Sequence, residues 1–176
     1  MDIMLISPNT IKSLGELSAN VDDTYLGAAI RVAQEVYLTD AVGTELVEKL
    51  KDLVEKKING QADGIDATEN IAYRTLLDEY IKYVLVYKSL EETALRTALK
   101  IRSLNTVRNS DTNSQPAELD DVKYLIDHFR TYFNHWLNRT TEFLCENKEA
   151  ITEAKVECDK CKQKSKFGNI NLYLGN

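Results

Sequence analysis

The sequence has 176 residues, a net charge of −6, 43% hydrophobic and 28% charged residues, which suits one compact domain. Only seven Gly and two Pro interrupt it, so the composition favours a mainly helical protein and excludes a disordered chain. No apolar run approaches the roughly 18 residues of a membrane span, and no secretory signal is apparent at its start. We therefore expect a soluble helical protein, and its acidity disfavours a general nucleic-acid binder.

Two helices are predicted before Gly43. Ser7, which precedes a proline, is typical of a helix start, and Asp22 or Asp23 can cap the second helix. The spacing of apolar residues in the second helix predicts a buried face made by Leu26, Ile30, Ala33 and Tyr37.

Two further helices are expected on either side of a polar loop at residues 59–68. The first is capped by Thr44, and its predicted buried face consists of Val47, Leu50, Val54 and Ile58. The second runs from Glu69 to about Leu90, with a continuation to Lys100. Its middle, residues 83–87, is apolar all round, which is typical of a fully buried helix. The apolar residues of this helix include Leu77, Tyr80, Ile81, Val84 and Leu85.

The helical pattern stops over residues 103–121, which are rich in Ser, Asn, Asp and Thr. Loops of this length in a compact domain are usually functional or disordered, and this one is predicted to be a loop or a short projecting hairpin. A long final helix follows, capped by Asp120 or Asp121. Its predicted stripe consists of Val122, Leu125, Ile126, Phe129, Phe133, Trp136, Leu137, Thr140 and Leu144.

The chain becomes polar and lysine-rich after Glu149, so we divide it into a bundle over residues 1–148 and an arm over 149–176. Alternating polar and apolar residues near the end of the arm predict one short strand. A lone strand cannot pair with itself, which makes its apolar side chains the candidate assembly residues. These are Ile170, Leu172, Tyr173 and Leu174.

The fold class expected from these patterns is an all-α small helical bundle of about four to five helices. It carries a mid-chain loop or short hairpin projection and an extended C-terminal arm that ends in a short strand.

Cys158 and Cys161 form the one recognisable short motif, a Cys-x2-Cys pair. A closed zinc site needs four ligands, for which only Cys145, His128 and His135 remain. Three interpretations stay open: an incidental or subunit-stabilising pair, a metal site, and a redox pair. An odd number of cysteines in a chain without an export signal argues against a disulfide framework.

The other candidate groups indicate no catalysis. His128 and His135 lie on one face of the final helix, but seven residues apart is too far for two ligands of one ion without help. No phosphate-binding loop, nucleophile elbow or zinc-protease motif is present. We therefore expect a protein that is no enzyme and holds no cofactor.

The order of elements resembles a known family. The run D-D-x-Y-L-x-x-A-I-x-x-A-Q at Asp22–Gln34, then G-T-E-L at Gly43–Leu46, is similar to the head–tail connector (adaptor, or ring) proteins of tailed bacteriophages. The Tyr-rich L-L-D-E-Y-I-K-Y-V-L-V-Y at Leu76–Tyr87 and the apolar end I-N-L-Y-L-G at 170–175 are also similar. Versions from phages of Bacteroidetes hosts, including crAss-like phages, look closest.

This resemblance implies a structural virion protein without enzymatic activity. Such proteins are helical bundles assembled as a homo-oligomeric ring, typically of twelve copies, that docks beneath the portal protein at the head–tail junction. The ring extends the DNA channel and offers a platform for tail or stopper proteins. Net acidity suits a lumen past which genomic DNA slides without specific binding. The alternatives are a cytosolic helical-bundle interaction module and a Cys-x2-Cys metal-dependent protein.

Overall fold

The computed structural model describes residues 3–15, 21–104 and 119–158, with side chains at 3–15, 21–96 and 122–158. The described part of the chain is helical and contains no strand, which confirms the expected all-α bundle. Its elements in chain order are α1 (Pro8–Leu14), α2 (Asp23–Val32), the π-helical turn η1 (Ala33–Leu38), α3 (Thr39–Val42), α4 (Thr44–Ile58), the 3-10 turn η2 (Thr68–Asn70), α5 (Ile71–Leu76), the π-helical turn η3 (Leu77–Ile81), α6 (Lys82–Leu104) and α7 (Leu119–Glu146).

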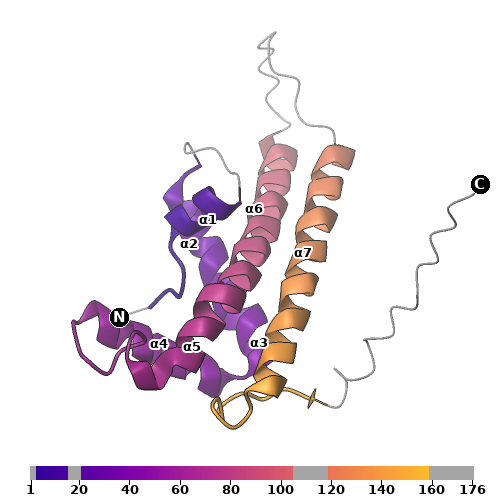
Figure 1. Ribbon diagram of the computed structural model, residues 1–176. Helices are drawn as coiled ribbons and strands as arrows, with labels where there is room; N and C mark the ends of the chain where they lie inside the picture. Colours follow the sequence, from indigo (N-terminus) through magenta and orange to yellow (C-terminus); the bar gives the residue numbers. More distant parts are fainter. Residues whose placement is uncertain (1–2, 16–20, 105–118, 159–176) are drawn as a thin grey trace, which may run out of the picture.

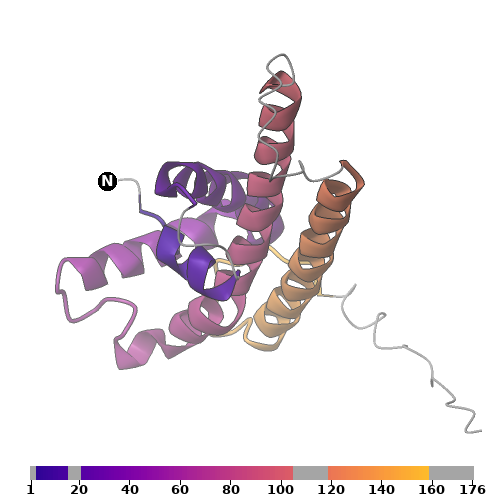
Figure 2. The ribbon, with the colours of Figure 1, turned by 90° about the horizontal axis from the view of Figure 1, so that it is seen from above.

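Helix α6 is the centre of the bundle (Figure 1). It packs along α7 on one side and against α2 and α1 on the other, as the view from above also shows (Figure 2). The far ends of α6 and α7 extend beyond the other helices as an antiparallel helical hairpin (Figure 1). Helix α4 and α5 lie near the opposite end of the molecule.

The core confirms that the segment around residues 83–87 is deeply buried. Val84, Leu85 and Val86 are enclosed, and the burial continues through Leu90. Around them pack apolar side chains of the other elements, including Ile11, Leu26, Ile30, Leu46, Leu50, Leu76, Ile81 and Leu144. Burial of this apolar surface is the main driving force for the fold.

The buried face of the second predicted helix shifts by one residue part-way along. Leu26, Ile30 and Ala33 are buried as predicted, but Tyr37 is exposed and Leu38 takes its place in the core. The cause is η1, because a π-helical turn holds one more residue than an α-turn and advances the register of everything that follows.

Helix α4 spans Thr44–Ile58, and the predicted Thr44 cap is wrong, because Gly43 is the N-cap and no side chain caps the helix. Val47 and Leu50 are buried as predicted and Val54 is partly buried, whereas Ile58 is 65% exposed. Leu46 and Leu53 are buried in addition. Ile58 is the final residue of the helix, where the chain leaves the core for the polar loop.

Helix α7 buries its predicted stripe most completely in the second half. Phe133, Thr140 and Leu144 are enclosed, and Phe129, Trp136 and Leu137 are partly buried against the core. Leu125 is 45% exposed, near the start of the helix. Both helices also extend into the stretch predicted as a loop: α6 ends at Leu104 and α7 begins at Leu119. Residues 105–118 between them lie outside the described residues.

The first part of the predicted arm lies against the bundle. Ile151 is buried, and the Lys155 N–H donates to the carbonyl of Val42 over 3.0 Å. Gly43 permits this close approach, because a Cβ at that position would stand 3.0 Å from Cβ of Lys155. Gly43 also has φ of 94°, a conformation that favours glycine. The predicted strand at the end of the arm lies outside the described residues.

Candidate interaction surface

Aromatic rings join α6 to α7 along their length. Tyr80, in η3, and Tyr83, at the start of α6, lie three residues apart and so share a helix face. Tyr83 stacks on Trp136 with ring centroids 4.3 Å apart, and Tyr80 packs on Phe143 at 4.6 Å. The Arg139 guanidinium lies over both Tyr80 and Trp136, at 5.8 and 5.2 Å from their ring centroids. These stacked pairs define one rigid interface between the two helices.

Beyond this interface the hairpin presents an exposed apolar face on α7. Tyr124 is 72% exposed and Leu125 45% exposed, and Tyr132 is exposed beside them. His128 packs between the two tyrosines, with ring centroids 6.2 Å from Tyr124 and 4.8 Å from Tyr132. We call these four residues the hairpin face. Exposed aromatic residues clustered in this way are typical of protein interaction sites.

A buried charged cluster lies where the hairpin leaves the bundle. The Nζ of Lys88 donates to the Glu91 carboxylate over 2.8 Å and lies 3.7 Å from the centroid of the Tyr37 ring. Across the helix interface, Nε of Arg130 also donates to Glu91, over 2.9 Å. Lys88 and Glu91 are both buried, so each charge is stabilised by the other, and Arg130 is a second positive partner for Glu91.

The sequence interpretation missed this cluster. A signal was nevertheless present, because Lys88 and Glu91 continue the most apolar stretch of the chain. Charged residues beside such a stretch are rarely enclosed unless they are paired. The partner on α7 could not be chosen from sequence, since Arg130 lies 39 residues from Glu91.

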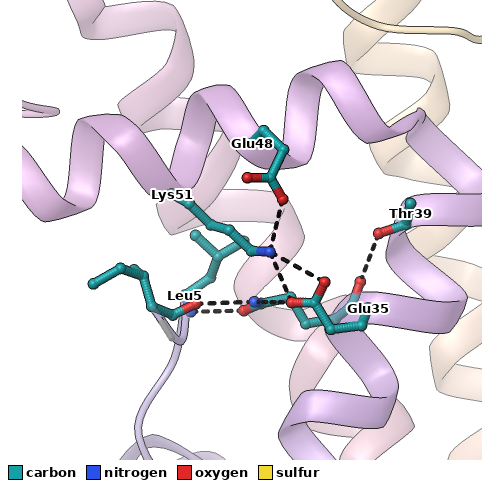
Figure 3. A network of polar contacts seen from close by, with 7 residues as sticks. Leu5, Glu35, Thr39, Glu48 and Lys51 are labelled. Carbon is teal, nitrogen blue, oxygen red and sulfur yellow. Dashed lines mark hydrogen bonds and ion pairs between the residues drawn. The ribbon is translucent and has the colours of Figure 1, made fainter. Parts of the chain in front are cut away.

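A second polar network attaches the N-terminal segment, residues 3–7, to η1 (Figure 3). The Leu5 N–H donates to Oε1 of Gln34 over 2.8 Å, and Nε2 of Gln34 donates to the carbonyl of Ile3 over 3.0 Å. The Thr39 hydroxyl donates to the carbonyl of Gln34, across the wide turn of the π-helix. The buried amide of Gln34, in η1, thus holds the N-terminal segment against the bundle.

The same network contains Glu35, Lys51 and Glu48 (Figure 3). Nζ of Lys51 lies 2.8 Å from the Glu35 carboxylate and 2.9 Å from that of Glu48. Burial raises the pKa of Glu35, but the hydrogen bonds from Lys51 and Gln34 outweigh it, so that pKa lies below its ordinary value. Burial lowers the pKa of Lys51, yet its two carboxylate partners leave it above the ordinary value. Both groups are therefore charged at neutral pH.

A cleft of about 450 Å³ opens beside the N-terminal segment. We call it the N-terminal cleft; it is lined by residues 3–7, Thr10, Ile58, Leu77, Asp78 and Lys82. Its walls come from the N-terminal segment, the end of α4 and the second π-helical turn, η3. Most of these side chains are apolar, and Asp78 and Lys82 supply charges of both signs.

Polar and covalent contacts hold the first part of the arm. The Tyr73 hydroxyl donates to the Glu153 carboxylate over 2.7 Å. Burial raises the pKa of Tyr73 to about 12, and the carboxylate adds to this effect. Cys145, near the end of α7, forms a disulfide with Cys158 and so closes residues 146–157 into a loop. Glu153 and Cys158 thus fix both the middle and the end of this segment.

The expectation that argued against a disulfide is therefore wrong for Cys158. Its partner is Cys145, thirteen residues earlier, and their Cα atoms lie 5.5 Å apart. The prediction failed because the return of the arm along the bundle brings the two cysteines together, a tertiary contact that a cysteine count does not reveal. Cys161, the other half of the Cys-x2-Cys motif, lies outside the described residues, as do Ile170, Leu172, Tyr173 and Leu174.

The two histidines make separate contacts with different aromatic rings. His128 belongs to the hairpin face, and His135 packs edge-on against Trp136 at 5.6 Å. Within residues 3–15, 21–96 and 122–158, no group of three or more His, Cys, Asp or Glu side chains is placed to hold a metal ion. Among the helices of the described residues, none is both long and apolar enough to cross a membrane.

The disulfide provides a direct test of how the arm is held. Cys145→Ser is expected to lower the free energy of unfolding by about 2–3 kcal/mol. Without the disulfide, the unfolded chain is no longer restricted by a closed loop of this size and gains conformational entropy. Urea unfolding measures this change, and hydrogen exchange should become faster in residues 147–158. Cys161→Ser is the matched control and should leave both unchanged; the reverse result would contradict the pairing.

Fold and surface together define a small all-α bundle protein with a projecting helical hairpin. The chain belongs to DUF6712, a family of unknown function, which matches residues 38–164. The match includes α4 to α7 and the disulfide-linked segment, but α1 and α2 precede it. No curated protein and no solved structure matches the chain.

Proposed function

We propose that the protein is a structural component of a tailed-bacteriophage virion. Copies of the chain form a ring, typically of twelve, beneath the portal at the head–tail junction. The ring extends the DNA channel and gives tail or stopper proteins a surface on which to dock. This proposal includes the absence of enzymatic activity and places the protein in the virion after synthesis in the host cytoplasm.

The observation that carries the proposal is the projecting α6–α7 hairpin with its exposed apolar face. Tyr124, Leu125 and Tyr132 are exposed on α7, which is already helical, so they can enter a partner interface without a new helix having to form. The aromatic stacks at Tyr83 and Trp136 fix the two helices against each other at the base. Such a hairpin suits contact with a large preformed ring such as a portal.

Charge also supports a role beside DNA without binding it. The chain has a net charge of −6, so a ring of many copies would present an acidic assembly. Negatively charged walls give phosphates no contacts and repel them at short range. DNA could then slide through the lumen without being held.

The main alternative is a cytosolic interaction module in which the hairpin face binds a single partner helix. An apolar helix face is equally suited to that role. The two readings differ in stoichiometry: the connector forms a ring on a portal, whereas the module forms a complex of one or two copies. The alternative of a Cys-x2-Cys metal site would lack one of its two thiolate ligands, because Cys158 is bonded to Cys145.

The proposal predicts co-assembly with the portal protein of the same phage. We expect the mixture to migrate as a single large species in size-exclusion chromatography with light scattering, and to show a ring below the portal in micrographs. Leu125→Glu should weaken this co-migration by about tenfold or more, since a charge would be buried at the contact.

Ile71→Glu is the matched control, because Ile71 is 64% exposed and lies on α5, away from the hairpin. It should co-assemble like the unmodified chain. A chain that stays monomeric or dimeric with the portal present would contradict the connector and favour the interaction module.

A further inference from the structure

The N-terminal cleft has the chemistry of a site for an extended apolar segment. Leu5, Ile6 and Leu77 lie in its walls and are themselves buried. Ile58 lies at the same cleft but is 65% exposed, so it offers apolar surface that nothing within the described chain covers. A segment that entered the cleft would cover Ile58 and bury further apolar area.

The chain itself contains a segment that fits this site. Residues 159–176 begin with four lysines in eight positions and end in alternating apolar residues at 170–174. The alternation is typical of an extended peptide that places every second side chain in a groove. Its eighteen residues, fully extended, span at most about 60 Å.

Charge favours the same pairing. Residues 159–176 carry four lysines and one aspartate, whereas residues 1–70 hold thirteen acidic and six basic side chains. Asp78 supplies the one carboxylate among the residues that line the cleft, and Lys82 supplies an ammonium group there as well. A lysine of the basic stretch can therefore pair with Asp78 while the apolar end enters the cleft.

The positions of donor and acceptor favour a neighbouring copy. The last described residues, at the foot of α7, and the N-terminal segment lie on opposite flanks of the bundle, with α6 between them (Figures 1 and 2). Donor and acceptor on opposite flanks suit a head-to-tail contact, which forms a ring where the rotation between copies closes and an open filament where it does not.

We propose that the N-terminal cleft binds residues 170–174 of a neighbouring copy of this chain. Ile170, Leu172 and Leu174 enter against Ile58 and the N-terminal segment, and a lysine that precedes them pairs with Asp78. This inference rests on the proposed ring and deepens it, since it names the contact that joins one copy to the next.

A labelled peptide of residues 166–176 tests the site directly. We expect it to bind the full chain and the Ile71→Glu control alike in fluorescence anisotropy, and Ile58→Glu at least about tenfold more weakly. Ile58→Ala provides a second, milder variant with a smaller loss, should the charged one fail to fold. A peptide that binds neither form, or binds Ile58→Glu as well as the control, would overturn the inference.

A mixing experiment tests the direction of the contact. Leu172→Glu removes the donor and keeps the cleft, whereas Ile58→Glu removes the cleft and keeps the donor. Each variant alone should stay monomeric by mass photometry, and their mixture should give a one-to-one dimer and nothing larger. If Ile58→Glu self-associates as the Ile71→Glu control does, the tail binds elsewhere and the inference is wrong.

The portal experiment distinguishes failure of this inference from failure of the proposed function. Co-assembly with the portal by a chain that does not bind the peptide would support the connector and overturn the cleft contact. Peptide binding by a chain that does not co-assemble with the portal would support the cleft contact and overturn the connector.

Discussion

Glu91→Ala is expected to lower the free energy of unfolding by about 3–5 kcal/mol. Glu91 is 2% exposed and accepts hydrogen bonds from Lys88 and Arg130. Its removal would leave the Lys88 ammonium buried against the Tyr37 ring. The remaining carboxylate, that of Glu92, lies 3.7 Å from Nζ of Lys88, too far to replace the lost hydrogen bond. Urea unfolding followed by circular dichroism measures the loss.

Two further variants identify the cause of that loss. Replacing both buried members with apolar residues, Lys88→Met with Glu91→Leu, should recover most of the stability, because no buried unpaired charge then remains and the half-exposed Arg130 keeps its contact with Asp127. Asp127→Ala removes an exposed contact of Arg130 and should change the free energy by less than about 1 kcal/mol. A Glu91→Ala variant as stable as Asp127→Ala would show that the cluster does not support the base of the hairpin.

Gln34→Ala is expected to lower the free energy of unfolding by about 2–4 kcal/mol and to release the N-terminal segment. The side-chain amide of Gln34 pairs with the Leu5 N–H and the Ile3 carbonyl, and an unpaired buried backbone group costs about 1–3 kcal/mol. Hydrogen exchange should become faster at residues 3–7 well before the rest of the bundle opens.

Glu48→Ala is the matched control within the same network. Glu48 contacts Lys51 at 2.9 Å but is largely exposed, so its loss should change stability by no more than about 1 kcal/mol. Equal effects of Gln34→Ala and Glu48→Ala would mean that the N-terminal segment is held by its apolar side chains alone.

The starts of α1 and α2 and the end of α3 could be predicted because local chemistry sets them. Ser7 and Asp22 accept hydrogen bonds from Thr10 and Thr24 at the starts of α1 and α2, as their sequence positions indicate. Gly43 ends α3 because its positive φ is readily reached only by glycine. Each of these signals acts within a few residues, so a single sequence contains it.

The candidate sites depended on contacts that local sequence does not encode. The π-helical turn moved burial from Tyr37 to Leu38, and no apolar pattern marks where one residue is inserted. The contact between Gln34 and Leu5 joins residues 29 positions apart. Cys145 and Cys158 meet because the chain reverses after α7. Tertiary packing decides all three.

The Gln34 contacts bear on which parts of the proposed contact relatives share. The family matches residues 38–164, so the N-terminal wall of the cleft, the Gln34 amide that holds it and residues 170–174 lie outside the matched range, whereas Ile58 and Leu77 lie within it. A tail and an N-terminal wall that change together would keep the proposed contact between copies of one chain and lose it between relatives.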